Sequence, residues 1–233
     1  PWRWDGEWAH KRCVCRAAGD GNLAALKLFM AAQADLQCTG GPLSPLHWAV
    51  MKGQKASISV LASGNGEGLI PMNPGGITPL HMAAQGRVEC MRELFSCRVA
   101  GDINAVDTMG MTPLHIASKG SFVYEIAELC DQAANLEAKE SIGWTALHLA
   151  ADNGLTDTVR VLIQKGADVN ARSKIQRTPL HLACCSTSGR QSAHVSVSTF
   201  CSAPNVDVDL QDADGFTALH WACALGHAQA VRE

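Results

Sequence analysis

The side chains best suited to metal binding or proton transfer in this sequence are nine histidines. Imidazole binds zinc and titrates near neutral pH, but a zinc site needs several ligands at short, defined spacing. His10, His194 and His227 are far apart, and none begins a His-Glu-x-x-His pattern. The other six recur at nearly constant intervals, which favours a structural role. We therefore predict neither a metal site nor histidine catalysis.

Ten cysteines are scattered through apolar segments. The only close pairs are Cys13 with Cys15 and Cys184 with Cys185, and neither has the Cys-x-x-Cys spacing of a zinc site. We expect no secretory leader, and the sequence contains no Asn-x-Ser/Thr acceptor. We predict free, buried thiols in a reducing compartment, the cytoplasm or the nucleus.

Composition and missing motifs exclude several function classes. The net charge of −3 does not favour binding to nucleic-acid phosphates, and no apolar run is long enough to insert into a bilayer. There is no Gly-x-Ser-x-Gly elbow or kinase motif, and the glycine-rich residues 64–68 lack the Lys-Ser/Thr of a phosphate loop. We expect a chain that is not an enzyme and that needs no cofactor.

The six periodic histidines each end a Thr/Ser-Pro/Ala-Leu-His motif. Its first residues are 34, 34, 33, 33 and 39 positions apart, at Ser44, Thr78, Thr112, Thr145, Thr178 and Thr217. Such regularity indicates an internal repeat. The six histidines are therefore expected to be parts of this repeat.

Each motif predicts the start of a helix. Ser or Thr is a good N-cap, and Pro suits the first helical position because it needs no hydrogen-bond donor there. A small residue follows two places after each His, and a glycine such as Gly154 closes the helix. A second amphipathic helix follows, as at Val159, Leu162 and Ile163. Such a helix pair buries its apolar face only by stacking on its neighbours.

The unit from Glu140 to Ala171, with its motif helix and its Gly-Ala-Asp-Val-Asn ending, resembles the ankyrin repeat almost position for position. The resemblance implies an all-α repeat solenoid of helix-turn-helix pairs with β-turn or hairpin tips. It also implies that the motif histidines hydrogen-bond within and between repeats. After a Trp-rich segment or cap at 1–12, we expect one array whose repeats span residues 13–38, 39–72, 73–106, 107–139, 140–172, 173–211 and 212–233.

Several repeats depart from the ankyrin pattern. The first is degenerate, the second ends irregularly at 64–68, and the sixth holds an insertion near 186–192. The last is cut short inside a helix and the chain begins with Pro1, so we expect a piece of a longer protein.

The resemblance implies a protein–protein interaction scaffold or adaptor that binds another protein through its concave face and turn tips. The partner's identity is open, and the chain is compatible with a subunit of a larger complex. The alternative is the substrate-recognition arm of a larger ligase, kinase, acyltransferase or channel, with no catalysis in this segment.

The binding residues expected on the tips are mostly apolar. They directly precede the motifs or lie two residues earlier, and comprise Ile77, Met109, Met111, Ile142, Trp144, Ile175, Arg177 and Phe216. Exposed apolar side chains of this kind are enriched at interface centres. The alternative is that neighbouring tips pack against one another. Polar contacts are expected from the inner-helix ends at Lys119, Asp152 and Asn153.

The resemblance also implies a modification. Ankyrin asparagines of the Asp-Val-Asn turn are substrates of an asparaginyl hydroxylase, and Asn170 and Asn104 match that position. Both are therefore candidate hydroxylation sites.

Overall fold

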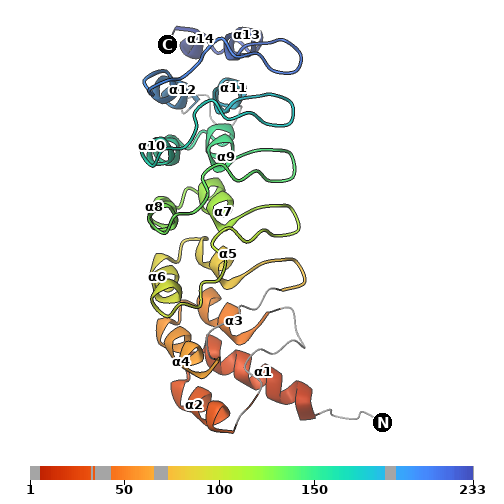
Figure 1. Ribbon diagram of the computed structural model, residues 1–233, viewed down its shortest axis with the longest axis vertical. Coiled ribbons are helices and arrows are strands. Elements are labelled where there is room, and N and C mark those ends of the chain that lie inside the picture. Colours follow the sequence, from red (N-terminus) through yellow and green to blue (C-terminus); the bar gives the residue numbers. More distant parts are fainter. Residues whose placement is uncertain (1–5, 33, 35–42, 66–72, 187–192, 233) are drawn as a thin grey trace, which may run out of the picture. The chain divides into compact units, whose positions relative to one another are not determined.

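The computed structural model describes residues 6–32, 34, 43–65, 73–186 and 193–232 (Figure 1). In these ranges the regular structure is helical, apart from one isolated antiparallel bridge between Gln211 and Thr217. The helices are α1 (Gly6–Gly19), α2 (Leu23–Ala31), α3 (Pro45–Met51), α4 (Lys55–Asn65), α5 (Pro79–Ala83), α6 (Val88–Ser96), α7 (Pro113–Lys119), α8 (Val123–Asp131), α9 (Ala146–Asp152), α10 (Thr156–Gln164), α11 (Pro179–Cys185), α12 (Ala193–Cys201), α13 (Ala218–Ala224) and α14 (Ala228–Arg232). None of them is long and apolar enough to span a bilayer.

The chain divides into two compact units, with the boundary between Thr108 and Met109, where the sequence predicted one continuous array. In the first unit α1, α3 and α5 pack in order, and α2, α4 and α6 form a second row. In the second unit the inner helices α7, α9, α11 and α13 pack in order beside the outer helices α8, α10, α12 and α14. Both units are therefore all-α repeat arrays, and the predicted fold class is confirmed.

Some predicted features lie at or beyond the limits of the described residues. Helix α1 begins at Gly6, so it runs through the predicted segment boundary after residue 12. Trp2, Trp4, most of the loop at 64–68 and the insertion beyond Ser186 lie outside the described residues.

The inner helices begin where the motifs predicted. A Ser or Thr in extended conformation is the N-cap of α3, α5, α7, α9, α11 and α13. In each case its hydroxyl lies 2.8 Å from Nδ1 of the motif histidine, which also accepts the N-cap backbone N–H. This reciprocal capping box satisfies amides that a helix start would otherwise leave unpaired.

The small residue after each histidine allows the inner helices to pack closely. Five of these alanines are completely buried and the sixth is 1% exposed, at Ala49, Ala83, Ala117, Ala150, Ala183 and Ala222. The motif leucines are also buried up to Leu180, whereas Leu219 in the last repeat is 54% exposed. Within each unit, a repeat thus covers the apolar face of the one before it.

The outer helices α6, α8 and α10 are each followed by a residue in the left-handed backbone region, which favours glycine. Gly166 follows α10 with a φ of 94°, whereas Ala133 occupies the equivalent place after α8 with a φ of 63°. The left-handed conformation costs alanine about 1–2 kcal/mol relative to glycine. Replacing alanine with glycine recovers this energy, but glycine's greater freedom in the unfolded chain offsets up to about 1 kcal/mol of the recovered stability.

We predict that Ala133→Gly raises the free energy of unfolding by about 0.5–1 kcal/mol, measured by urea denaturation. Gly166→Ala is the matched reverse change, because a Cβ there meets nothing within 4 Å and adds only backbone strain. It should lower stability by about 1 kcal/mol. A loss of stability in Ala133→Gly would contradict the strain at this turn.

Candidate functional site

The motif histidines connect successive repeats through backbone carbonyls. The backbone N–H of the N-cap donates to Nδ1, as from Thr145 to His148 at 3.2 Å, so the proton of the neutral ring lies on Nε2. Nε2 then donates to the carbonyl that precedes the next motif. These bonds join His47 to Ile77, His115 to Trp144, His148 to Arg177 and His181 to Phe216, at 2.9–3.1 Å.

Three of these rings, His47, His148 and His181, are held in the neutral form. Burial lowers the pKa of His148 to about 4, against the opposing effect of its hydrogen bond to Arg177. Burial lowers the pKa of His47 and His181 as well, against similar backbone bonds. Across the described ranges there is no group of three or more His, Cys, Asp or Glu side chains able to hold a metal ion. The histidines thus act as connectors between repeats.

In four hairpins a polar residue, four positions before the residue that precedes the motif, organises the tip, and this was not predicted from the sequence. Glu140 Oε1 accepts the backbone N–H groups of Ile142 and Trp144, and Asp212 Oδ1 accepts those of Asp214 and Phe216. Similarly, Asn73 Oδ1 accepts the backbone N–H groups of Gly75 and Ile77, and Ser173 Oγ accepts that of Arg177. The sequence contains a pattern that could have revealed this residue, because a polar side chain recurs four residues before the residue that precedes each motif.

The structure corrects which tip residues are exposed. Met111 was expected on the surface but is only 9% exposed, and Ile77 and Trp144 are half-buried. A residue directly before the N-cap lies at the root of its hairpin, where its carbonyl faces the preceding repeat's histidine. The residue two places earlier lies farther out, so Met109, Ile142 and Ile175 are 62%, 53% and 50% exposed.

We call Met109, Ile142 and Ile175 the apolar tip row. All three belong to the second unit, where the loops extend from the inner helices on the side away from the outer helices (Figure 1). The carbonyl of each accepts a backbone N–H of the next tip, from Ser141, Lys174 and Ala213 respectively, at 3.0–3.3 Å. Successive tips are therefore held together by main-chain bonds while the apolar side chains face water.

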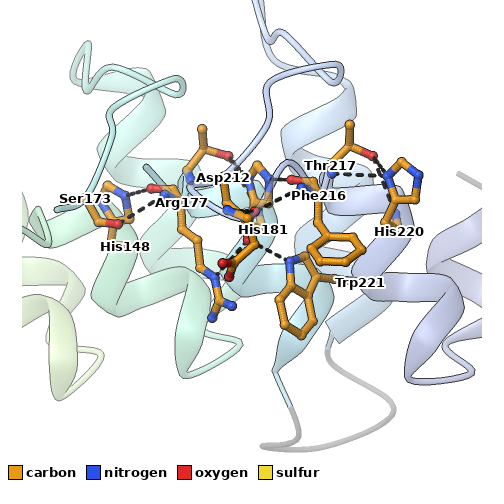
Figure 2. Close-up of polar contacts among 11 residues, drawn as sticks. His148, Ser173, Arg177, His181, Asp212, Phe216, Thr217, His220 and Trp221 are labelled. Carbon is orange, nitrogen blue, oxygen red and sulfur yellow. Dashed lines mark hydrogen bonds and ion pairs between the residues drawn. The ribbon is translucent and has the colours of Figure 1, made fainter. Parts of the chain in front are cut away.

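Arg177 and Phe216 belong to a cluster in the last two repeats of the second unit (Figure 2). The buried Asp212 carboxylate accepts from Trp221 Nε1 at 2.9 Å and lies 3.3 Å from Arg177 Nε. Burial raises the pKa of Asp212, but hydrogen bonds from Trp221, the backbone and Arg177 outweigh it and leave that pKa lowered. The Arg177 guanidinium lies 4.3 Å from the Trp221 ring centroid. Arg177 is thus mainly a contact between repeats.

Phe216 is both packed and accessible. Its ring meets those of His220 and Trp221 edge-on at 5.9 Å, and 47% of the residue stays exposed. Of the expected tip residues outside the apolar tip row, it presents the most apolar surface.

The polar helix-end residues do not form one cluster of available side chains. Lys119 is exposed at the end of α7. Asp152 and Asn153 are half-buried: the Asp152 carbonyl accepts from Ser186 Oγ at 2.7 Å, and Asn153 Nδ2 donates to Leu149. Burial raises the pKa of the Asp152 carboxyl.

The two candidate hydroxylation sites, Asn104 and Asn170, lie in two turns of the same kind. The backbone N–H of Asn104 donates to Asp102 Oδ1, and that of Asn170 to Asp168 Oδ1, both at 2.9 Å. The Asn170 amide also bridges to the next repeat, donating to Asn205 O at 2.7 Å and accepting from Asp207 N at 2.9 Å. Hydroxylation stays a prediction, which intact-mass measurement would test.

The described cysteines are free thiols, but the expectation that all are buried is wrong. Cys90 and Cys184 are buried, whereas Cys13, Cys201 and Cys223 are exposed. Burial raises the pKa of Cys184 to about 12, which keeps it protonated at neutral pH. It packs as a small apolar side chain.

Comparison with known proteins agrees with this geometry. The sequence matches the family described as "Ankyrin repeats (3 copies)" over residues 14–107, 97–173 and 130–194, and "Ankyrin repeat" over 214–233. No curated protein matches it. The crystal structure of the ankyrin repeat domain of Bcl-3, described as a unique member of the IkappaB protein family, is similar with a TM-score of 0.82. It is 24% identical, and the alignment covers 94% of this chain and 97% of that one. Capping boxes, stacked helix pairs and sequence matches over most of its length agree: the chain belongs to the ankyrin repeat family.

Proposed function

We propose that this chain is a protein-interaction module and that the apolar tip row is the centre of its binding surface. Ankyrin repeats are generally protein–protein interaction modules. The observation that supports this surface is the exposure of Met109, Ile142 and Ile175, each at least 50%, at one position of three consecutive hairpins. Apolar side chains aligned in this way favour association because a partner removes them from water together.

The surface is rigid before binding. Main-chain bonds connect each tip to the next, and polar side chains such as Glu140 fix the hairpin roots. A preorganised surface loses little conformational entropy on association, so more of the apolar contact free energy contributes to affinity. Phe216 extends the accessible apolar surface toward the last repeat.

The test compares captured proteins between matched variants of the full chain. Wild type, Met109→Ser/Ile142→Ser/Ile175→Ser and the control Tyr124→Ser are immobilised, and bound proteins are quantified by mass spectrometry. Tyr124 is 75% exposed but lies on the outer helix α8. We expect the triple variant to lose a partner that the other two retain, with an affinity about tenfold lower or worse when that partner is purified.

The control isolates the tips from apolar exposure in general. Circular dichroism should show the same helix content in all three proteins, because serine at an exposed tip removes no core contact. Equal retention of every captured protein by the triple variant would reject the apolar tip row as the binding surface.

A further inference from the structure

We propose that the tips formed by residues 138–144 and 171–177 select an acidic segment of the partner protein, one that presents carboxylates beside apolar side chains. We call these two segments the basic tip pair. The inference rests on the proposed function, because the same tips supply Ile142 and Ile175. It adds a charge requirement that the apolar row alone does not impose.

The basic tip pair has a charge opposite to that of the whole chain. It contains four cationic side chains, Lys139, Arg172, Lys174 and Arg177, and one carboxylate, Glu140, whereas the chain has a net charge of −3. Arg177 is paired with Asp212, but the ion pairs among the described residues do not include Lys139, Arg172 or Lys174. Lys139 also interacts electrostatically with Glu137, just outside the segment, but none of the three is held in an ion pair, so their charge is available to an incoming carboxylate.

The two lysine ammonium groups bridge the two tips that carry the isoleucines. Lys174 Nζ donates to Ser141 O at 2.6 Å, next to Ile142 in the chain, and Lys139 Nζ donates to Arg172 O at 2.9 Å. An ammonium has three donors, so each retains capacity for a partner's carboxylate. The lysines and isoleucines thus offer charge and apolar contact together, on one rigid surface.

The main chain of these tips is already used. The carbonyls of Ile142 and Ile175 accept from Lys174 and Ala213 of the following tips. Addition of a partner strand through these atoms would require breaking those bonds. Recognition must come from side chains, which makes affinity depend on the partner's charge and on ionic strength.

The next tip marks the end of this surface. At residues 210–216 the place of Ile142 and Ile175 is taken by the exposed Asp214, and the segment carries only acidic charge, from Asp212 and Asp214. An acidic partner segment is therefore favoured on the basic tip pair and disfavoured beyond it.

The experiment selects binding sequences from a random peptide library displayed on phage, using the full chain as bait. We expect wild type to enrich peptides that carry Asp or Glu beside Leu, Ile, Met or Phe. Lys139→Gln/Lys174→Gln keeps side-chain N–H donors but removes both charges, and should weaken the selected peptides about tenfold. Lys139→Glu/Lys174→Glu should instead enrich basic peptides, while the control Lys27→Glu, exposed on α2, should behave as wild type.

The contrary outcomes separate the two proposals. Enriched peptides without acidic residues, but lost on Ile142→Ser/Ile175→Ser, would overturn the charge requirement and leave the apolar tip row standing. Enrichment unchanged by both sets of variants would overturn both, as would no enrichment. Saturable binding of a mixed-sequence single-stranded RNA, abolished by Lys139→Gln/Lys174→Gln, would overturn the assignment to an acidic protein segment.

Discussion

Replacing Gly143 with alanine is expected to lower the free energy of unfolding by about 3 kcal/mol. Gly143 has a φ of 83°, and a Cβ there would lie 2.7 Å from the backbone nitrogen of Lys174 in the next tip. Backbone cannot swing aside as a flexible side chain can. The substitution thus combines left-handed strain with a clash that separates the two tips and disrupts the bond from Lys174 N to Ile142 O.

Gly215→Ala separates these two effects. Gly215 has nearly the same φ, 81°, but a Cβ at this position meets nothing within 4 Å. It should cost only the backbone strain, about 1 kcal/mol. Urea denaturation followed by circular dichroism measures both variants. Equal losses would show that contact between tips contributes nothing, and would also weaken the case for a preorganised binding surface.

The parts of the fold that the sequence predicted are those specified by neighbouring residues. Ser or Thr, Pro and His within four positions define a helix start, and the structure confirms that start at Thr78, Thr112 and Thr178. The burial of the following alanine is equally local, because its place on the helix determines which neighbour it faces. Repetition of one local rule therefore predicted most of the helical framework.

The site was only partly predictable, because exposure depends on the neighbouring repeat. Met109 and Met111 are both apolar and two residues apart, yet one is 62% and the other 9% exposed. The repeat pattern located the hairpin but did not say which of its residues lies at the root. The contact of Asp212 with Arg177, 35 positions away, has no local signature either. Such pairs appear only when adjacent repeats are placed together.

The motif histidines were predicted as structural, and their environment makes stability depend on pH. His148 is fully buried, accepts the Thr145 N–H at Nδ1 and donates from Nε2 to Arg177 O. Protonation would add a hydrogen at Nδ1, where a backbone N–H already points, and would bury a charge. Burial of the charged ring lowers the pKa of His148 from 6.5 to about 4 and outweighs the opposing effect of the bond to Arg177.

We predict that acidification destabilises the chain through this ring. Between a pKa of 6.5 in the unfolded state and about 4 in the folded state, the unfolded chain binds more protons, so stability falls as pH decreases. For His148 alone, the loss from about pH 7 to about pH 5 is about 2 kcal/mol, and it approaches about 3 kcal/mol below the folded pKa. The lowered pKa values of His47 and His181 act in the same direction.

Urea denaturation of wild type and His148→Gln at several pH values measures this contribution. Glutamine retains an N–H donor for Arg177 O but does not titrate, so the variant should be less stable at neutral pH and lose about 2 kcal/mol less between about pH 7 and about pH 5. A parallel pH dependence in both proteins would show that His148 is not protonated on unfolding in this range. A shallower dependence in the variant would instead establish that the folded chain requires the neutral imidazole, whose unprotonated Nδ1 accepts the Thr145 N–H.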